Sequence, residues 1–185
     1  MLYLNCRRKI LDELIDIFDE NGNYIKKEMK SVAHRKGHWH KSIHAYLVND
    51  KKEIVIQKRS ANKDFYPSIW DVSFAGHVGA GESTKSSAIR ECQEELGICL
   101  SENEIEYLFT NPEKLHYGNV ISNEFVDVFL CKKNFNKIVK QDEEIDDVKV
   151  IKLEGLISMI ENKDQNLFPH YQEYERILPI LKNIK

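Results

Sequence analysis

The chain has 185 residues, which suits one domain, and 42% of them are hydrophobic, enough for a core that needs no disulfide or metal to fold. Its 27 Lys and Arg against 30 Asp and Glu give a net charge of −3, which argues against a general nucleic-acid binder. Every apolar run falls short of the roughly 18 residues that a membrane span needs, and residues 1–9 turn polar too early for a signal peptide.

The four cysteines form no CxxC pair, which is typical of reduced thiols in a reducing compartment. We therefore predict a single cytoplasmic domain over residues 1–185, in which residues 1–12 form a flexible N-terminal extension. Neither a nucleic-acid partner nor a membrane partner is expected.

In chain order, the first predicted element is a hairpin, because residues 14–25 alternate apolar and polar around Asn21-Gly22. A second strand pair covers residues 43–57 and turns at residues 49–52. The polar stretch 60–68 is typical of a surface loop. Further strands are predicted at residues 71–80, 105–110, 125–131 and 148–153.

Three helices are predicted. Ser83 can cap a helix that runs to Leu96 and stops at Gly97, and a short helix follows at residues 155–161. Residues 171–184 have apolar side chains at helical spacing, with a kink or break predicted at Pro179. Strands before and after one central helix indicate an α+β fold with a mixed sheet covered by helices.

The segment from residue 76 to residue 98 carries the chemistry. On a helix, Glu91, Glu94 and Glu95 share one arc of about 100°, beside Arg90. Like charges at this spacing repel, and a hard divalent cation such as Mg²⁺ relieves that repulsion. The glycines before the helix let the backbone approach a ligand, and a helix N-terminus favours anions. The alternative interpretation is a solvated acidic helix face.

The spacing in this segment resembles the Nudix box. Its fixed positions are filled by Gly76, Glu82, Arg90, Glu91, Glu94, Glu95 and Gly97, and its apolar positions by Cys92 and Ile98. If each fixed residue occurs at about 6%, a chance match somewhere in the chain has a probability on the order of 10⁻⁶. The resemblance implies the Nudix fold, an α/β/α sandwich around a mixed β-sheet.

The resemblance also implies a MutT-like pyrophosphohydrolase that uses Mg²⁺, with Mn²⁺ as a substitute. Its substrate would be a small molecule with a diphosphate linked to another group X, such as a nucleoside diphosphate derivative. Glu91 and Glu95 are then the implied metal ligands, Glu94 is a further ligand or the base, and Arg90 orients the carboxylates. A homodimer is expected by resemblance alone.

Outside the box, residues 57–77 resemble the isopentenyl-diphosphate isomerase-like branch of the family. There the residues that match Arg59 and Lys63 hold the diphosphate, and those that match His40, His77 and Glu124 lie in the active-site metal region. The resulting prediction has two sets. The catalytic set is Glu94, Glu91, Arg90 and Glu124, and the substrate-binding set is Arg59, Lys63, Gly76, His77 and His40.

Ala75 stands where isomerases of this branch carry their catalytic cysteine, and the complete box also favours hydrolysis over isomerisation. Two alternatives stay open: an isopentenyl-diphosphate isomerase-like enzyme, and a non-catalytic module that senses nucleotides. The group X, the general base, the number of metal ions and the oligomeric state are also open. His34, His38, His40 and His44 suggest zinc, but without cysteines at finger spacing only His40, with His77, is predicted to belong to the site.

Overall fold

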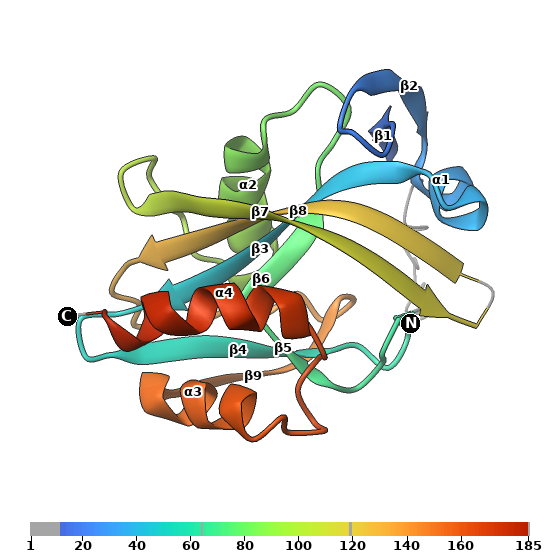
Figure 1. Cartoon of the computed structure of the whole chain (residues 1–185). Coiled ribbons are helices and arrows are strands. Elements are labelled where there is room, and N and C mark those ends of the chain that lie inside the picture. Colours follow the sequence, from blue (N-terminus) through green and yellow to red (C-terminus); the bar gives the residue numbers. More distant parts are fainter. Residues whose placement is uncertain (1–11, 64, 119, 185) are drawn as a thin grey trace, which may run out of the picture.

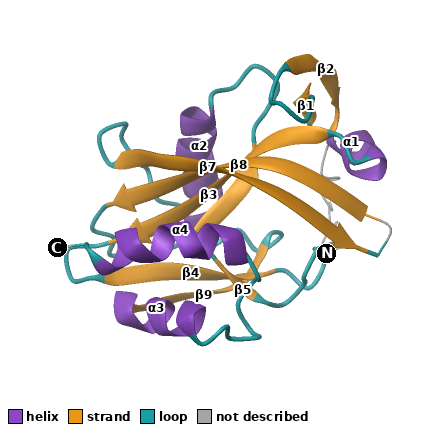
Figure 2. Cartoon of the chain, in the orientation of Figure 1, coloured by secondary structure: helices purple, strands orange, loops and turns teal. Residues whose placement is uncertain are grey.

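A computed structural model describes residues 12–63, 65–118 and 120–184. Its nine strands belong to one mixed sheet, and helices cover both faces of that sheet (Figures 1 and 2). This is the predicted α+β sandwich. The predicted N-terminal extension at residues 1–12 lies outside the described residues, apart from Asp12.

The elements have the following bounds. The strands are β1 (Leu14–Phe18), β2 (Tyr24–Met29), β3 (Trp39–Val48), β4 (Glu53–Arg59), β5 (Trp70–Asp71), β6 (Phe74–His77), β7 (Ile105–Tyr117), β8 (Val120–Lys132) and β9 (Ile145–Lys152). The helices are α1 (Lys30–Lys36), α2 (Thr84–Leu96), α3 (Leu153–Glu161) and α4 (Tyr171–Lys182).

Strand β3 is the centre of the sheet. One edge pairs in parallel with β8 along its whole length, and His40 lies opposite Glu124. The other edge meets three short antiparallel partners in turn: β1 at one end, β6 in the middle and β4 at the far end. In the β6 pairing, Ser42 lies opposite His77. The register of β3 thus brings residues from β8 and β6 to the same place.

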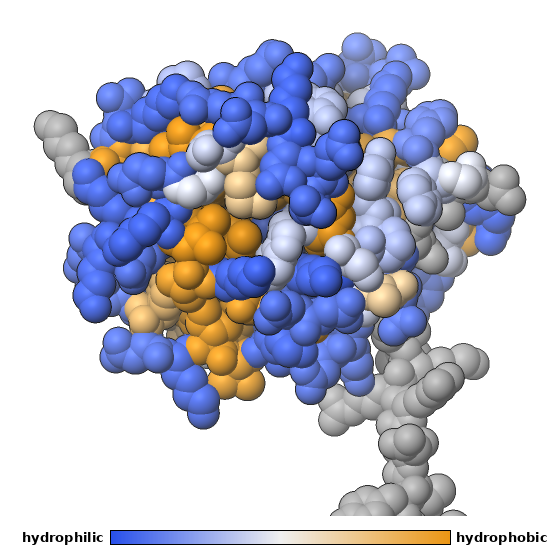
Figure 3. All heavy atoms as spheres, turned by 90° about the horizontal axis from the view of Figure 1, so that it is seen from below, coloured by the Kyte–Doolittle hydropathy of each residue, from blue (hydrophilic) through white to orange (hydrophobic). Residues whose placement is uncertain are grey.

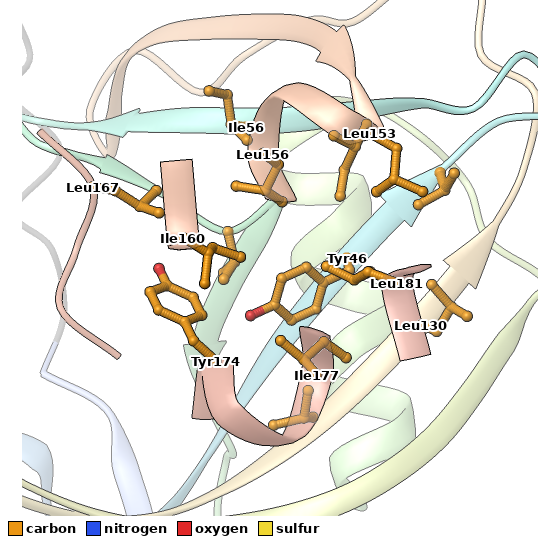
Figure 4. Close-up of a cluster of buried hydrophobic side chains, with 14 of the residues drawn as sticks. Tyr46, Ile56, Leu130, Leu153, Leu156, Ile160, Leu167, Tyr174, Ile177 and Leu181 are labelled. Carbon is orange, nitrogen blue, oxygen red and sulfur yellow. The ribbon is translucent and has the colours of Figure 1, made fainter. Parts of the chain in front are cut away.

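Two hydrophobic cores lie on the two faces of the sheet. Because side chains alternate along a strand, Ile43, Ala45 and Leu47 pack toward α2 while Tyr46 and Val48 pack toward α3 and α4. The core between the sheet and the helices α3 and α4 contains apolar side chains from β3, β4, β8, α3 and α4 (Figure 4). The sheet is therefore sandwiched between α2 on one side and the pair α3 and α4 on the other.

Most local predictions are confirmed. The hairpin of β1 and β2 and the antiparallel pair of β3 and β4 form as expected. Helix α2 begins after Ser83, whose Oγ accepts the Ser86 N–H at 3.1 Å, and it ends at Gly97, whose φ of 68° lies in the left-handed region. The capping residues therefore set both ends of the helix that carries the box.

Four local features differ from the predictions, and the first is α1. This helix was not predicted, because the chain offers no side-chain cap next to its start. Instead, Asp12 accepts hydrogen bonds from Ser31 N–H at 3.1 Å and from Ser31 Oγ at 2.6 Å. A tertiary contact across β1 and β2 thus supplies the cap. In addition, the strand predicted over residues 71–80 is split into β5 and β6.

The other two differences concern prolines. Strand β7 continues through Pro112, which was expected to lie beyond its end. Among the described residues β7 pairs only with β8, and an edge strand tolerates a missing N–H. Helix α4 runs unbroken through Pro179, so of the predicted kink or break the break is wrong. An interior proline costs about 3 kcal/mol, but burial of Ile177 and Leu181 offsets this at about 1.5–3 kcal/mol each.

On the face seen from below, hydrophilic side chains surround an apolar area (Figure 3). Among the described residues, no helix is both long and apolar enough to cross a membrane.

Candidate active site

A pocket of about 580 Å³ gathers nearly all of the predicted site residues. Its walls come from α1, the end of β4 and the loop after it, β6, α2, β7, β8 and the loop before β9. The predicted residues that line it are Arg59, Lys63, Gly76, His77, Arg90, Glu91, Glu94, Glu95 and Glu124. His40 does not line the pocket, but its ring stacks on that of His77 with centroids 5.2 Å apart.

The acidic wall comes from α2. Ala88, Cys92 and Leu96 pack into the core, as the helical periodicity predicts. On the adjoining arc Glu91 and Glu95 are buried, with 9% and 4% of their surfaces exposed. The Glu94 side chain remains about half exposed. The three carboxylates therefore differ in burial: two face the pocket from inside the fold and the third stands at its edge.

Arg90 holds the carboxylates of this wall in place. Its Nη1 donates to Glu91 Oε1 at 2.7 Å and to Glu94 Oε2 at 2.9 Å, and its Nη2 donates to Glu82 Oε2 at 3.2 Å. Glu82 is itself anchored by the Gly79 N–H at 3.3 Å. One arginine thus orients three of the four box glutamates, and Glu82 stands behind the other carboxylates.

Strand β6 packs directly against the buried carboxylates. A Cβ added at Gly76 would lie 2.2 Å from Glu91 Cδ, which leaves no room for any side chain there. The neighbouring Ala75 donates its N–H to Glu95 Oε2 at 3.2 Å. Glycine at residue 76 is therefore required by the close approach of the strand to Glu91.

The two buried carboxylates have raised pKa values. Burial raises the pKa of Glu91 to about 7, against the opposing charge of Arg90. Burial and then the charge of Glu91 raise the pKa of Glu95 to about 8. Both groups thus lack enough positive charge around them to stay ionised easily. Oxygen donors with this deficit fit a hard divalent cation.

A second group of metal-binding side chains adjoins this wall. His34 of α1, His40 of β3, His77 of β6 and Glu124 of β8 each offer one donor atom within 4.8 Å of the others. His40 Nδ1 lies 3.0 Å from the His38 carbonyl, so it carries the proton and Nε2 is left as an acceptor. That buried Nε2 has no hydrogen-bond partner in the described part of the chain, and it lies 3.9 Å from Glu124 Oε1.

The protonation state of this group suits a metal ion. Burial lowers the pKa of His77 well below its usual value, so the ring is neutral near pH 7. Ser122 Oγ donates to Glu124 Oε1 and so favours the ionised carboxylate. His34 was not predicted to belong to the site. The structure instead places its Nε2 3.2 Å from His77 Nε2. The interpretation failed there because these ligands come from four separate elements.

The basic residues of the pocket are each paired with an acid. Arg59 Nη1 donates to Asp71 Oδ2 at 3.0 Å, and Lys63 forms an ion pair with Glu144. Sequence reasoning missed Lys30, which also lines the pocket and pairs with Glu13 at 2.8 Å. No motif marked these partners, since they lie outside the box and meet only in the fold. Other residues missed in the pocket wall are Leu115, Gln141, Glu143 and Phe168.

Comparison with known proteins agrees with this geometry. The NUDIX domain family model matches residues 38–174, and the chain belongs to the Nudix family. It is 33% identical over 162 residues to an uncharacterised Nudix hydrolase of Clostridium acetobutylicum, covering 85% of this chain and 78% of that protein. It is 28% identical over 153 residues to isopentenyl-diphosphate Delta-isomerase 2 of Photorhabdus laumondii, covering 82% and 84%.

The fold is also shared with solved structures. The crystal structure of DR0079 from Deinococcus radiodurans superposes with a TM-score of 0.67 at 19% sequence identity. The match covers 92% of this chain and 98% of that one. At this identity the likeness concerns the fold alone.

Proposed function

We propose that this Nudix protein is a Mg²⁺-dependent pyrophosphohydrolase that cleaves a diphosphate linked to another group. The observation that carries the proposal is the pair Glu91 and Glu95, buried one helical turn apart in the pocket wall with too little positive charge around them. Arg59 and Lys63 line the same pocket and supply charge for a diphosphate.

Glu91 and Glu95 would hold the cation, with Glu94 at the edge as a further ligand or the base. A bound divalent cation would polarise the diphosphate and lower the pKa of a water molecule. Arg90 keeps Glu91 and Glu94 in position through its two hydrogen bonds. One box glutamate accepts the proton of the water that attacks phosphorus, and the P–O bond to the leaving group breaks.

The histidine group supports a second cation position. His34, His40, His77 and Glu124 would together supply three imidazoles and one carboxylate. Such nitrogen-rich donor sets suit Zn²⁺ better than Mg²⁺. Mn²⁺ accepts the same oxygen donors as Mg²⁺, so we propose it as a substitute cofactor at the carboxylates of α2.

Hydrolysis is favoured over isomerisation by one residue in the pocket wall. Ala75 lies beside Gly76 and has no group that could donate or accept a proton from its side chain. A substrate of nucleoside diphosphate type, or another small diphosphate, fits the proposal. Action in the cytoplasm and a homodimeric state are carried over as proposals, the first supported by the free thiols of Cys92, Cys99 and Cys131.

The test is a panel of nucleoside diphosphate derivatives and isopentenyl diphosphate, incubated with Mg²⁺ and followed by mass detection of both products. Glu91→Gln and Glu95→Gln keep the side-chain shape but remove charge, so turnover should fall by a factor on the order of 10³ or more in each. The exposed Glu102→Gln serves as the matched control and should be unaffected. Dimethylallyl diphosphate as the main product, or full activity in both variants, would contradict the proposal.

A further inference from the structure

Arg59 is held by protein groups on two sides. Its Nη1 donates to Asp71 Oδ2 at 3.0 Å, while Nε and Nη2 donate to the Phe65 carbonyl at 3.2 and 3.0 Å. These bonds use three of the five N–H groups of a guanidinium. The other two have no partner among the described residues, and the side chain lines the pocket. Arg59 is therefore oriented and still has donors to offer.

The contacts that hold Arg59 extend through Asp71 to the start of α4. Asp71 is 1% exposed, and its second oxygen, Oδ1, lies 3.1 Å from His170 Nε2. His170 is also buried, and its Nδ1 lies 2.9 Å from Glu113 Oε1. The residue immediately precedes α4 and occupies its N-cap position. A continuous chain of contacts thus runs from α4 through Asp71 to the pocket.

Geometry makes His170 a cation. Both ring nitrogens face carboxylate oxygens, which can only accept hydrogen bonds, so both nitrogens carry a proton. His170 therefore shares the negative charge of Asp71 with Arg59. The N–H at Nε2 also fixes Oδ1 of Asp71, while Oδ2 of the same carboxylate accepts from Arg59.

We propose that Asp71 and His170 are positioning residues for Arg59, so that their contacts set the affinity of the pocket for a diphosphate. The inference rests on the role of Arg59 in the proposed function. An arginine that is already held loses less side-chain freedom when it binds a phosphate oxygen, which strengthens binding. Phe168 supports the arrangement, because its ring stacks on His170 at 4.1 Å and lies 5.1 Å from Arg59 Cζ.

The alternative role for these side chains is to bind a metal ion. His44, Glu113 and His170 offer donor atoms within 4.8 Å of one another. Both nitrogens of His170 are engaged by carboxylates, however, and His44 Nδ1 is engaged by Glu173 Oε2 at 2.7 Å. The carboxylates in this cluster already accept hydrogen bonds from protonated ring nitrogens. The geometry therefore favours a positioning role over a metal site.

The same buried cluster contains a hydrogen bond to α4 in which neither Asp71 nor Arg59 takes part. Tyr46 donates its hydroxyl to Glu173 Oε1 at 2.6 Å, and Glu173 belongs to the first turn of α4. Tyr46 lies in the core between α4 and the sheet (Figure 4). Tyr46→Phe removes a buried hydrogen bond to α4 without touching Asp71, and it is the matched control for general damage to the cluster.

The experiment compares two amides at residue 170. The amide nitrogen of Asn matches Nδ1 of histidine and can keep the bond to Glu113, whereas that of Gln matches Nε2 and can keep the bond to Asp71. The probe is methylenediphosphonate with Mg²⁺, and its Kd is measured by calorimetry on the full chain. Thermal unfolding of each variant, followed by circular dichroism, reports stability separately.

We expect His170→Asn to weaken binding about tenfold and His170→Gln to stay within about threefold of the parent, because only the latter keeps the contact that holds Asp71. Arg59→Ala should weaken binding at least as much as His170→Asn, and the double variant should match Arg59→Ala alone. Tyr46→Phe should lower the unfolding temperature with Kd unchanged. Equal Kd values for the two amides, or additive effects in the double variant, would overturn the proposal.

If His170→Asn does not fold, Asp71→Asn takes its place. One oxygen of Asp71 then becomes an NH₂ group, which cannot accept from either His170 or Arg59, so the chain of contacts is cut and binding should again weaken about tenfold. Unchanged binding would refute the positioning role. Because the probe is not hydrolysed, the readout is independent of turnover: an inactive parent whose variants still differ in Kd would refute only the proposed function.

Discussion

Buried carboxylates lie on both faces of the sheet, and their surroundings differ. On the α2 face, burial raises the pKa values of Glu91 and Glu95 to about 7 and about 8. On the α4 face, burial would raise the pKa of Glu173, but the charge of His44 holds it below its usual value. The same opposition, with His170 as the cation, lowers the pKa of Asp71.

The difference lies in the partner rather than in the burial. On the α4 face, His44 and His170 balance the negative charges of Glu173 and Asp71. This cluster therefore needs no further cation, and its role is to stabilise the fold. The α2 wall has one arginine for several carboxylates, so it is complete only when a further cation is present. A deficit of positive charge around buried acids therefore separates a site that recruits an ion from a cluster that stabilises structure.

The largest expected effect is a loss of stability when the charge-balanced cluster on the α4 face loses Glu173. Glu173→Ala leaves His44 and Tyr46 buried without their shared acceptor, which should lower the free energy of unfolding by about 3–5 kcal/mol. Urea denaturation measures this. Glu175→Ala on the exposed face of the same helix is the control, expected to change stability by less than about 0.5 kcal/mol. A loss as small as that of the control would mean that the cluster does not hold α4 in place.

On the α2 face, removing a buried carboxylate should raise the free energy of unfolding instead of lowering it. In metal-free buffer, the Glu95 proton is released by the unfolded chain above its usual pKa of 4.5 but kept by the folded chain up to about 8. The folded state binds more protons in this window, so Glu95 makes stability fall as pH rises from about 4.5 to about 8.

Glu95→Gln removes that penalty. In urea denaturation with chelator at pH 8, the variant should be more stable than the parent by on the order of 3 kcal/mol, and the two should agree at pH 4.5. Added Mg²⁺ should raise the stability of the parent more than that of the variant, because it binds the folded carboxylates. If the variant is destabilised at pH 8, Glu95 is not a strained acid and the contrast between the two faces fails.

The smallest effect tests the close packing of the wall. Alanine at residue 76 would place Cβ 2.2 Å from Glu91 Cδ, so the carboxylate must leave its position. Gly76→Ala should therefore reduce kcat/KM about a hundredfold, or about 2.7 kcal/mol. At Gly79 the nearest atom to an added Cβ is the flexible end of Glu82 at 3.2 Å, so Gly79→Ala is the matched control. Equal kinetics for the two variants would show that Glu91 tolerates displacement.

The family and the central helix of the protein were already determined by local sequence. Ser83 and Gly97 cap the two ends of α2. Helical spacing alone places Glu91 and Glu95 on one arc, beside the apolar side chains of α2 that pack into the core. These features depend on residues within a few positions of one another, and such short-range preferences can be predicted without knowledge of the rest of the chain.

Only the tertiary structure decided which of the histidines and acids work together. His34, His40, His77 and Glu124 meet because the register of β3 with β8 and β6 sets them side by side, and α1 depends on a cap from Asp12. His170 reaches Asp71 across 99 positions of sequence, and His44 reaches Glu173 across 129. Such contacts follow from strand pairing and helix packing, which sum many weak interactions between distant segments, so no local pattern of residues encodes them.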